Sequence, residues 1–386
     1  MIGLGRDSVI NGAEPSAPTF PNELTPEWVG HALLRSGVIA DARVVSIEVH
    51  PIGNGMAGTV VQVALEYDRH VSTAPKSVIV KLPAAPGATL DMALRLGIYE
   101  REARFYSEVA PNYSAPVPRL YHCSRLAPGR YALLLEDMSP AREGSLLYGC
   151  SFEQAATIVG WMGTAHATWW QSPALDALDW VPEPNYAAAS NLAAESAHGA
   201  WKIFRKKLGK HPPRHVVALG ERLSDTPQVL NQLSAAPRTL VHGDLRLPNV
   251  MFALAGEPVA IVDWQTVMRG RGPMDLAAFF LFSLSPVDRR RAEATLLPVY
   301  CRLLEAGGVQ GYPLEQCWRD YRLGLIDQFS QIVLLSSLLD VDSKLDHDVA
   351  NATGARLFAV IEDLDLMELL SPPRRWWSPV ARGKSH

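Results

Sequence analysis

The sequence has little of what marks a zinc-stabilised, nucleic-acid-binding or membrane protein. Its four cysteines are scattered over 386 residues without a CxxC pair or a metal-ligand spacing to histidine, so structural zinc is not expected. The formal net charge is −4, from 36 Lys and Arg against 40 Asp and Glu, so no positive excess would attract nucleic acid or an anionic membrane. No apolar run reaches the roughly 18 residues needed to cross a bilayer.

The first residues also lack the continuous apolar stretch of a signal peptide. Scattered cysteines are typical of proteins in a reducing compartment. Together these observations predict a soluble, cytoplasmic protein. Hydrophobic residues make up 48% of the chain and charged residues 20%, which is normal for a globular enzyme, and 386 residues are too many for one ordinary core. Two lobes or domains are therefore expected.

Strand patterns dominate the first part of the chain, and helix patterns dominate the rest. We expect residues 1–24, rich in Pro, Ser, Asn and Gly, to form a flexible arm. Residues 25–137 are expected to form a first lobe, 138–370 a second, and 371–386 a tail. The expected elements of the first lobe are a short helix after Thr25, strands at 43–52, 59–67, 77–82 and 131–135, and one helix at 90–109.

The second lobe is expected to be mainly helical. Ser151 and Gln154 form a capping-box pattern that opens a long helix. Residues 239–264 return to a strand pattern and interrupt the helices. Further helices are expected at 286–305, 314–340 and 351–370.

The sequence GNGMAG contains three glycines at GxGxxG spacing, Gly53, Gly55 and Gly58. In a dinucleotide-binding fold this motif would open a helix. Here it runs directly into an alternating strand pattern at 59–67. A glycine-rich loop between two antiparallel strands is how kinases cover the phosphates of a nucleotide, because glycine lets backbone N–H groups approach closely. An ordinary glycine-rich hairpin is the alternative.

Lys81 lies inside an apolar strand pattern, VIVKL, where an unpaired ammonium would be costly. Glu102 is a candidate partner, because its neighbours three and four positions away on the expected helix are apolar or aromatic. A Lys81–Glu102 ion pair would orient the lysine toward nucleotide phosphates. The alternatives are a lysine that reaches solvent and a glutamate in a core polar network.

The most informative segment is HGDLRLPN at 242–249, followed by IVDW at 261–264. Phosphoryl transfer needs an oriented nucleophile and cations that neutralise the phosphates. Asp244 can accept the proton of a substrate hydroxyl, and Asn249 and Asp263 offer the hard oxygen ligands that magnesium prefers. Arg246 can contact the γ-phosphate. The rival interpretation, a hydrolase metal site at His242 and Asp244, lacks further nearby ligands, and we interpret His242 as structural.

These motifs together resemble the aminoglycoside phosphotransferase superfamily, in particular its choline-kinase-like and ecdysteroid-kinase-like branch. The resemblance runs from about residue 50 to 340. The matching segments, in chain order, are GNGMAG, VIVKL, YEREARFY, LLLEDM, HATWW, HGDLRLPN, IVDWQ and GPMDLA.

The resemblance implies an α+β, bilobal protein-kinase-like fold. Its N-lobe would be an antiparallel sheet with one key helix, and its larger C-lobe would be mainly helical with a catalytic hairpin. ATP and Mg²⁺ would bind in the cleft between the lobes, with the backbone of about Glu136 to Met138 against adenine. By the same resemblance, Asp275 would brace the catalytic loop. His166 is expected to pack rather than to take part in chemistry.

The resemblance assigns the remaining residues by position. Lys81 and Glu102 resemble the phosphate-binding ion pair, and Asp244 resembles the catalytic aspartate. Asn249 and Asp263 resemble the magnesium ligands.

Several departures from protein kinases favour a small-molecule acceptor. HGD stands in place of HRD, Trp264 follows Asp263 in place of Phe, and the APE signature is missing. Only 11 residues separate Asp263 from Asp275, which leaves little room for an activation loop. The expected function is thus ATP- and magnesium-dependent phosphorylation of a small-molecule alcohol, without a nucleic-acid or membrane partner. A pseudokinase or nucleotide-dependent binding protein is the alternative, although Lys81, Asp244 and Asn249 are all present; a protein kinase is less favoured.

The sequence leaves the acceptor open. An aminoglycoside, macrolide, sterol-like or choline-like alcohol all remain candidates. Tryptophans in a pocket would favour a flat or apolar alcohol, although tryptophan packs more often in a core; those concerned are Trp161, Trp169, Trp170, Trp180 and Trp201. An acidic run could instead meet a cationic acceptor, or could be solvated surface; it consists of Asp340, Asp342, Asp346 and Asp348.

Overall fold

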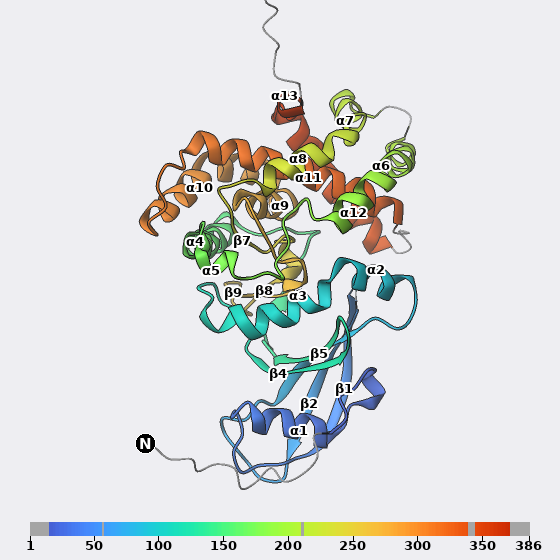
Figure 1. Cartoon of the computed structure of the whole chain (residues 1–386), viewed down its shortest axis with the longest axis vertical. Coiled ribbons are helices and arrows are strands. Elements are labelled where there is room, and N and C mark those ends of the chain that lie inside the picture. Colours follow the sequence, from blue (N-terminus) through green and yellow to red (C-terminus); the bar gives the residue numbers. More distant parts are fainter. Residues whose placement is uncertain (1–14, 56–57, 210–211, 339–343, 371–386) are drawn as a thin grey trace, which may run out of the picture.

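The computed structural model describes residues 15–55, 58–209, 212–338 and 344–370. A small lobe built on one antiparallel sheet and a larger, mainly helical lobe lie at opposite ends of the molecule (Figure 1). The expected α+β, bilobal protein-kinase-like architecture is confirmed. In the part of the chain that the structure describes, no helix is long and apolar enough to cross a membrane.

The N-lobe sheet has the strand order β1-β2-β3-β5-β4, with every neighbouring pair antiparallel. Its strands are β1 Val44–Gly55, β2 Gly58–Tyr67, β3 Ser77–Pro83, β4 Leu120–Ala127 and β5 Arg130–Glu136. Successive side chains of a strand point to opposite faces. In β3, Val78 and Val80 are therefore buried in a core with α1 (Pro26–Arg35), whereas Ile79 and Lys81 line the cleft between the lobes. Strand β4 was not expected from the sequence.

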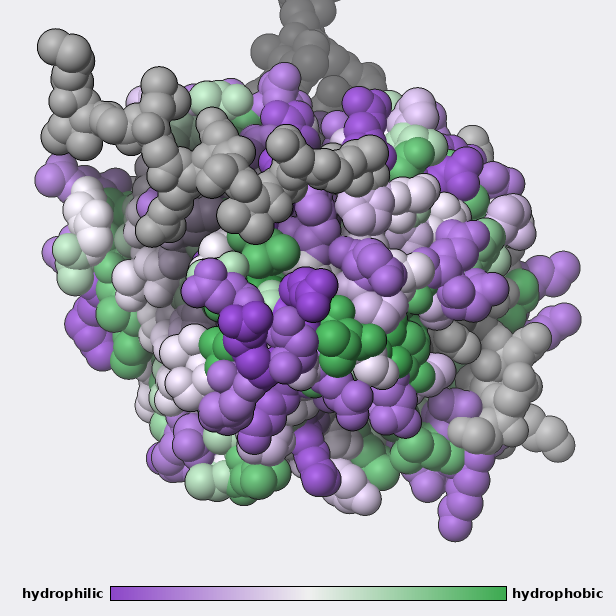
Figure 2. Space-filling view, turned by 90° about the horizontal axis from the view of Figure 1, so that it is seen from below, coloured by the Kyte–Doolittle hydropathy of each residue, from purple (hydrophilic) through white to green (hydrophobic). Residues whose placement is uncertain are grey.

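Helix α1 begins as its sequence predicts. The Thr25 side chain accepts a hydrogen bond from Trp28 N, and Pro26 occupies the first helical position. Trp28 and Leu33 are buried against the sheet. Of the expected arm, residues 1–14 lie outside the described residues, while Leu24 is buried in the same core, so the end of that segment belongs to the lobe. Viewed from the N-lobe end, the surface is largely hydrophilic, with separate groups of hydrophobic side chains (Figure 2).

The prediction of one continuous helix at 90–109 is wrong, because two helices occupy this region. Helix α2, Ala88–Leu96, ends at Gly97, which adopts the left-handed conformation (φ 69°) that glycine tolerates at a helix end. Helix α3, Ile98–Arg104, then starts at once and continues into a π-helical turn, Phe105–Val109. The break lets α3 lie across the cleft with Glu102 on its buried side.

The C-lobe core surrounds α9 (Pro273–Ser283), nearly all of whose residues are buried. The capping box at Ser151 and Gln154 opens α4 as predicted, and the helices expected at 286–305 and 314–340 are present in the described residues. The helix expected at 351–370 is wrong in its bounds, because one helix spans Lys344–Asp363 and a separate short one spans Met367–Leu370. The other helices are α4 Phe152–Trp169, α5 Pro173–Asp176, α6 Ala187–Lys207, α7 Arg214–Gly220, α8 Thr226–Ser234, α10 Pro286–Ala306, α11 Leu314–Leu338, α12 Lys344–Asp363 and α13 Met367–Leu370. Helices α5 to α9 were not predicted.

Short strands hold the loops that carry the central motifs. β7 pairs with β10, and β8 lies between β6 and β9. These strands are β6 Arg142–Glu143, β7 Thr239–Val241, β8 Val250–Phe252, β9 Pro258–Ile261 and β10 Met268–Gly270. The backbone N–H of Val262 donates to the carbonyl of Asn249 at 2.9 Å, which places the loop after β7 beside the loop after β9. The tail, 371–386, lies outside the described residues.

Candidate active site

A cleft of about 850 Å³ lies between the two lobes. Its lining combines apolar side chains of β2, β3 and β5 with polar side chains of α3 and of the loops after β7 and β9. The cleft brings together predicted site residues that lie far apart in the sequence; they are Gly58, Lys81, Glu102, Glu136, Met138, Asp244, Arg246, Asn249 and Asp263. Gly53 and Gly55 lie at the end of β1, while Met56 and Ala57 of the same motif lie outside the described residues.

Lys81 forms the ion pair with Glu102 that its apolar surroundings demand. Its Nζ lies 2.5 Å from Oε1 of Glu102 and 2.7 Å from Oδ1 of Asp263. Burial alone would lower the pKa of Lys81, but the carboxylates of Asp263 and Glu102 raise it above its usual value, so the ammonium stays charged. The Asp263 contact was missed at the sequence level, because 182 residues separate the two partners.

Glu102 is fixed from two sides. The backbone N–H of Trp264 donates a hydrogen bond to its carboxylate, in addition to the Lys81 contact. Burial raises the pKa of Glu102, and the Lys81 charge opposes that rise. The residue is only 4% exposed. Lys81, Glu102 and Trp264 thus join β3, α3 and the turn after Asp263.

The loop carrying Asp244 is braced by Asp275 at the start of α9. The Asp275 carboxylate accepts hydrogen bonds from the backbone N–H groups of His242 (2.7 Å) and Gly243 (2.9 Å). It also lies 3.3 Å from Nε2 of buried His166, as expected if His166 serves packing. Gly243 has φ +82°, and a Cβ there would approach the Thr266 carbonyl oxygen to 2.4 Å, so this position requires glycine.

His242 is structural in its contacts. Its Nε2 donates to the Val262 carbonyl oxygen at 3.0 Å, and its Nδ1 accepts from the Asp244 N–H at 3.2 Å. Both ring nitrogens are used, so the ring has no atom left for a metal. Within the described ranges, no group of three or more His, Cys, Asp or Glu could hold a metal ion. The rival hydrolase interpretation therefore has no support.

Asp244 is held by Arg246 and Asn249. Nε of Arg246 lies 3.0 Å from the carboxylate, and Nδ2 of Asn249 donates to both the Asp244 carbonyl (2.7 Å) and its Oδ2 (3.1 Å). Burial raises the pKa of Asp244, and the charge of Arg246 limits that rise. A carboxylate with a raised pKa is a better proton acceptor.

Asn249 and Asp263 present oxygen atoms toward the same part of the cleft. Because the amide nitrogen of Asn249 is turned to Asp244, its amide oxygen is available to a ligand. Asp263 adopts φ 65° and ψ 62°, a left-handed conformation that is unfavourable for a residue other than glycine. Burial would raise the pKa of Asp263, but Lys81 lowers it, so the carboxylate stays ionised.

At the other end of the cleft, the linker after β5 is anchored by Asp137. Its carboxylate accepts hydrogen bonds from Ser77 Oγ at 2.5 Å and Gln62 Nε2 at 2.7 Å. The Glu136 N–H donates to the Arg119 carbonyl, and the Met138 carbonyl accepts from Ala141 N. Sequence reasoning did not find Asp137, although an acidic residue inside the LLLEDM segment could have drawn attention to it.

The glycine-rich segment approaches β3 closely at Gly58. A Cβ at this position would come within 2.5 Å of the Leu82 carbonyl oxygen, so no larger residue fits without a shift of backbone. β2 begins at Gly58, and the motif joins antiparallel strands instead of opening a helix. This excludes the dinucleotide-binding arrangement of the same motif.

A second cavity of about 220 Å³ adjoins the cleft and is lined mainly by apolar side chains of the C-lobe. Gly243, Thr266 and Gln331 line both spaces, so the second cavity lies beside the Asp244 loop. We term it the side cavity. The tryptophans considered for a pocket line neither space and pack against the C-lobe core, which agrees with the commoner packing role of tryptophan.

The described part of the acidic run lines neither space. Asp340 and Asp342 lie outside the described residues. Asp346 and Asp348 lie at the exposed start of α12.

The sequence model of the ecdysteroid kinase-like family matches residues 52–307, which carry the glycine-rich segment, Lys81, Asp244 and Asp263. The chain belongs to the ecdysteroid kinase-like family. This membership confirms the resemblance seen in the motifs. It places the chain among small-molecule-kinase-like proteins.

Solved structures share the fold of this family member at low sequence identity. Choline kinase from Cryptosporidium parvum Iowa II is 12% identical, with a TM-score of 0.52 over 84% of this chain and 92% of that chain. The GDP complex of an aminoglycoside 2'-phosphotransferase-IIIa mutant is 13% identical, with a TM-score of 0.51 over 88% and 98%. Plasmodium vivax ethanolamine kinase is 13% identical, with a TM-score of 0.50 over 87% and 89%.

One curated protein matches over a shorter stretch. It is an uncharacterized oxidoreductase of Caenorhabditis elegans, dhs-27, 28% identical over 140 residues. The match covers 32% of this chain and 17% of that protein.

Proposed function

We propose that the protein transfers the γ-phosphoryl group of ATP, in a magnesium-dependent reaction, to a hydroxyl group of a small molecule. The observation that carries this proposal is the convergence of Lys81, Glu102 and Asp263 with Asp244 and Asn249 in one cleft. A charged lysine held between two carboxylates is suited to phosphate binding.

The cleft offers a site of suitable shape for a nucleotide. Val60, Ile79 and Leu133 would cover the faces of adenine, and the Met138 N–H in the linker would donate to its edge. Lys81 would contact the α- and β-phosphates, and the backbone N–H groups of Gly53, Gly55 and Gly58 would cover them. Glu136 contributes to the linker backbone beside the base.

The oxygen atoms of Asn249 and Asp263 fit a magnesium ion. Mg²⁺ prefers hard oxygen ligands and takes only one or two from protein, with phosphates and water completing its shell. The amide orientation of Asn249 and the ionised state of Asp263 satisfy this need. Bound magnesium–ATP would supply the phosphoryl group, and the positive charge of the magnesium ion would neutralise the negative phosphates.

The side chains of the catalytic loop would perform the proton chemistry. Asp244 accepts the proton of the acceptor hydroxyl as the oxygen–phosphorus bond forms and ADP leaves. Asn249 orients the Asp244 carboxylate by its hydrogen bond. Arg246 lies beside Asp244, and its guanidinium can contact the γ-phosphate either by changing rotamer or through the N–H groups that do not bind Asp244.

The side cavity supports an acceptor with an apolar body. It lies next to Gly243, one residue before the proposed base, and its lining is mainly Leu, Ile, Met, Val and Pro side chains. An acceptor whose hydroxyl reaches Asp244 can bury apolar surface there, at roughly 25 cal/mol per Å². This favours apolar alcohols over aminoglycoside-like or choline-like acceptors.

The first experiment is mass spectrometry of a mixed alcohol library incubated with the protein and magnesium–ATP. The library spans sterols, macrolides, aminoglycosides, choline-like alcohols and sugars, and Asp244→Asn serves as the matched control because it keeps side-chain shape. We expect a phosphoryl mass gain on an apolar alcohol with the wild type, absent with Asp244→Asn. Nucleotide binding without transfer to any alcohol would favour the binding-protein alternative.

A further inference from the structure

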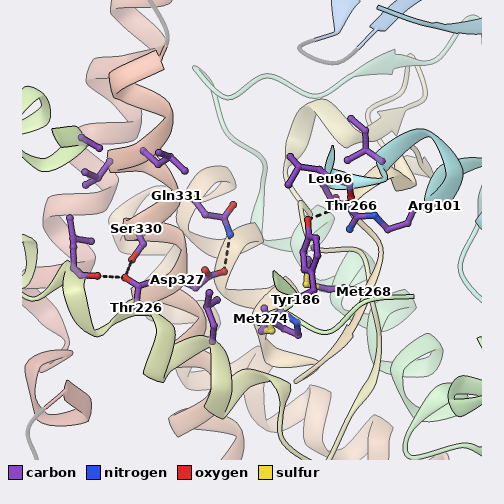
Figure 3. A pocket seen from close by; sticks show the side chains of 18 residues that line it. Leu96, Arg101, Tyr186, Thr226, Thr266, Met268, Met274, Asp327, Ser330 and Gln331 are labelled. Carbon is purple, nitrogen blue, oxygen red and sulfur yellow. Dashed lines mark hydrogen bonds between the residues drawn. The ribbon is translucent and has the colours of Figure 1, made fainter. Parts of the chain in front are cut away.

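The side cavity contains a buried carboxylate that the proposed transfer reaction does not use. Asp327 lies on the face of α11 that lines the cavity and is 5% exposed (Figure 3). Its carboxylate accepts one hydrogen bond, 2.8 Å from Nε2 of Gln331, one helical turn later. Among the described residues, no cation forms a salt bridge with it, and burial raises its pKa to about 6. Burying a carboxylate with a hydrogen bond to only one of its oxygens costs free energy unless a ligand or another group bonds to the second oxygen.

The contact between these two residues determines what they present to the cavity. An ionised carboxylate only accepts hydrogen bonds, so Gln331 must direct its NH₂ group to Asp327. The remaining carboxylate oxygen and the Gln331 amide oxygen are then both acceptors. The complementary group on a ligand is therefore a hydrogen-bond donor.

A second buried charge on the cavity wall argues against an ammonium as that donor. Arg101 of α3 is 4% exposed and lines the side of the cavity away from Asp327 (Figure 3). Its guanidinium donates to the Leu96 carbonyl at 2.7 Å and contacts Tyr186 Oη at 3.3 Å, and it forms no ion pair among the described residues. Asp327 and Arg101 together leave the wall without net charge. An ammonium would lose its hydration there while the Arg101 charge opposes its attraction to Asp327, whereas a hydroxyl loses far less.

The other polar side chains of the wall are already satisfied. Thr226 Oγ1 donates to the Leu223 carbonyl at 2.7 Å and lies 3.0 Å from Ser330 Oγ, which in turn donates to the Ile326 carbonyl. Figure 3 shows this pair apart from Asp327 and Gln331. On the α11 side of the cavity, the acceptor atoms still available to a ligand are therefore those of Asp327 and Gln331.

We propose that Asp327 is a specificity-determining residue that accepts a hydrogen bond from a second hydroxyl of a neutral, mainly apolar acceptor. The inference rests on the proposed phosphotransferase function. Because Gln331 lines both the cleft and the side cavity, one molecule can place its first hydroxyl at Asp244 and its second at Asp327. Such an acceptor is a diol whose two hydroxyls are separated by an apolar body.

The test uses matched probes and matched variants. The probes are unbranched α,ω-diols of increasing chain length, the corresponding mono-alcohols and the corresponding ω-amino alcohols. Wild type is compared with Asp327→Leu, which removes the acceptor, and with Ser330→Ala, which alters the same wall at an already satisfied hydroxyl. Calorimetry with magnesium and a non-hydrolysable ATP analogue measures binding, and mass spectrometry with magnesium–ATP measures kcat/KM.

We expect wild type and Ser330→Ala to prefer the best diol over its mono-alcohol by about tenfold, the size expected for a hydrogen bond to a charged group. In Asp327→Leu this ratio should fall to about one. An unchanged ratio in that variant, a preference for the amino alcohol, or no detectable binding of any diol to wild type would overturn the inference. Diol binding that depends on Asp327 without any phosphorylation would leave the inference standing and contradict the phosphotransferase function.

Discussion

The indole of Trp264 stacks on the ring of Phe105, with centroids 4.0 Å apart and planes inclined by 7°. Trp264 follows Asp263, and Phe105 lies three residues after Glu102, so the stack fastens the Asp263 turn to the segment that carries Glu102. Both rings are fully buried. Protein kinases use a Phe at the Trp264 position as a movable switch, whereas here the ring is packed face to face in the core. The Lys81–Glu102 pair is therefore held in place without an activation loop.

Phe105→Leu should weaken both the fold and nucleotide binding. Leucine fills much of the space but cannot stack, so we expect a loss of about 1–3 kcal/mol of unfolding free energy and several-fold weaker ATP binding. Phe279→Leu, at a fully buried position in α9, is the control and should lower stability with little effect on ATP affinity. Thermal unfolding measures the stability of each variant, and nucleotide titration measures its ATP affinity. Equal effects of the two variants on ATP affinity would contradict the role of the stack.

Lys81 and Glu102 should behave as one unit in a double-mutant cycle. Lys81→Met leaves Glu102 and Asp263 as neighbouring uncompensated carboxylates, and Glu102→Gln frees the lysine to move toward Asp263. We expect the two losses of ATP affinity to be non-additive by about 1–3 kcal/mol. Nucleotide titration of the wild type, both single variants and the double variant gives the coupling. Additive losses would show that the contact does not orient Lys81 for phosphate binding.

Asp263→Asn should raise the magnesium concentration needed for nucleotide binding. The change removes a charge from the proposed metal site while keeping the side-chain shape, and it also weakens the Lys81 contact. We expect the magnesium midpoint to rise at least tenfold at fixed ATP concentration. Asp137→Asn, in the linker, is a control for a lost carboxylate in the same cleft. A midpoint that stays at the wild-type value would remove Asp263 from the metal site.

The Asp327 carboxyl should make stability depend on pH. Burial raises its pKa from 3.8 to about 6, so the folded protein holds this proton more tightly than the unfolded chain. Its contribution is therefore complete below about pH 4 and is lost as the pH rises through about 6, with a total of roughly 3 kcal/mol. Arg101 is the charged group that shares its cavity, and Asp275 of the adjacent α9 is turned toward the catalytic loop.

Asp327→Asn should remove this dependence. We expect its unfolding temperature to match that of wild type near pH 4 and to exceed it near pH 8, as followed by circular dichroism. Asp348→Asn, at an exposed position of α12, is the control and should match wild type at both values. A difference between Asp327→Asn and wild type that stays constant with pH would contradict the shifted pKa.

The sequence by itself determined that a strand-rich lobe precedes a mainly helical one, and it supplied the candidate chemical groups. Apolar alternation in β2 indicated which face of that strand is buried. The apolar run of β3 made Lys81 conspicuous, because a charge in such a run needs a partner. The spacing from Asp244 to Asn249 places both on one loop, so local chain geometry brings them together. The helix at 90–109 was expected to be continuous, because its apolar stripe is strong, and Gly97 broke it by taking a left-handed conformation.

Only the tertiary structure decided which distant groups meet. The contact of Lys81 with Asp263 and the stack of Trp264 on Phe105 each join segments whose separation in sequence carries no information about their distance in space. The side cavity also depends on tertiary structure, because Arg101 of α3 and Asp327 of α11 line it although they are more than 200 residues apart in the sequence. Tryptophans drew attention in the sequence as possible pocket residues, yet in the structure they are partly buried and pack against the C-lobe core. That Asp327 and Arg101 are both buried without an ion-pair partner among the described residues could not be predicted from the sequence, because burial and contacts are properties of the folded chain.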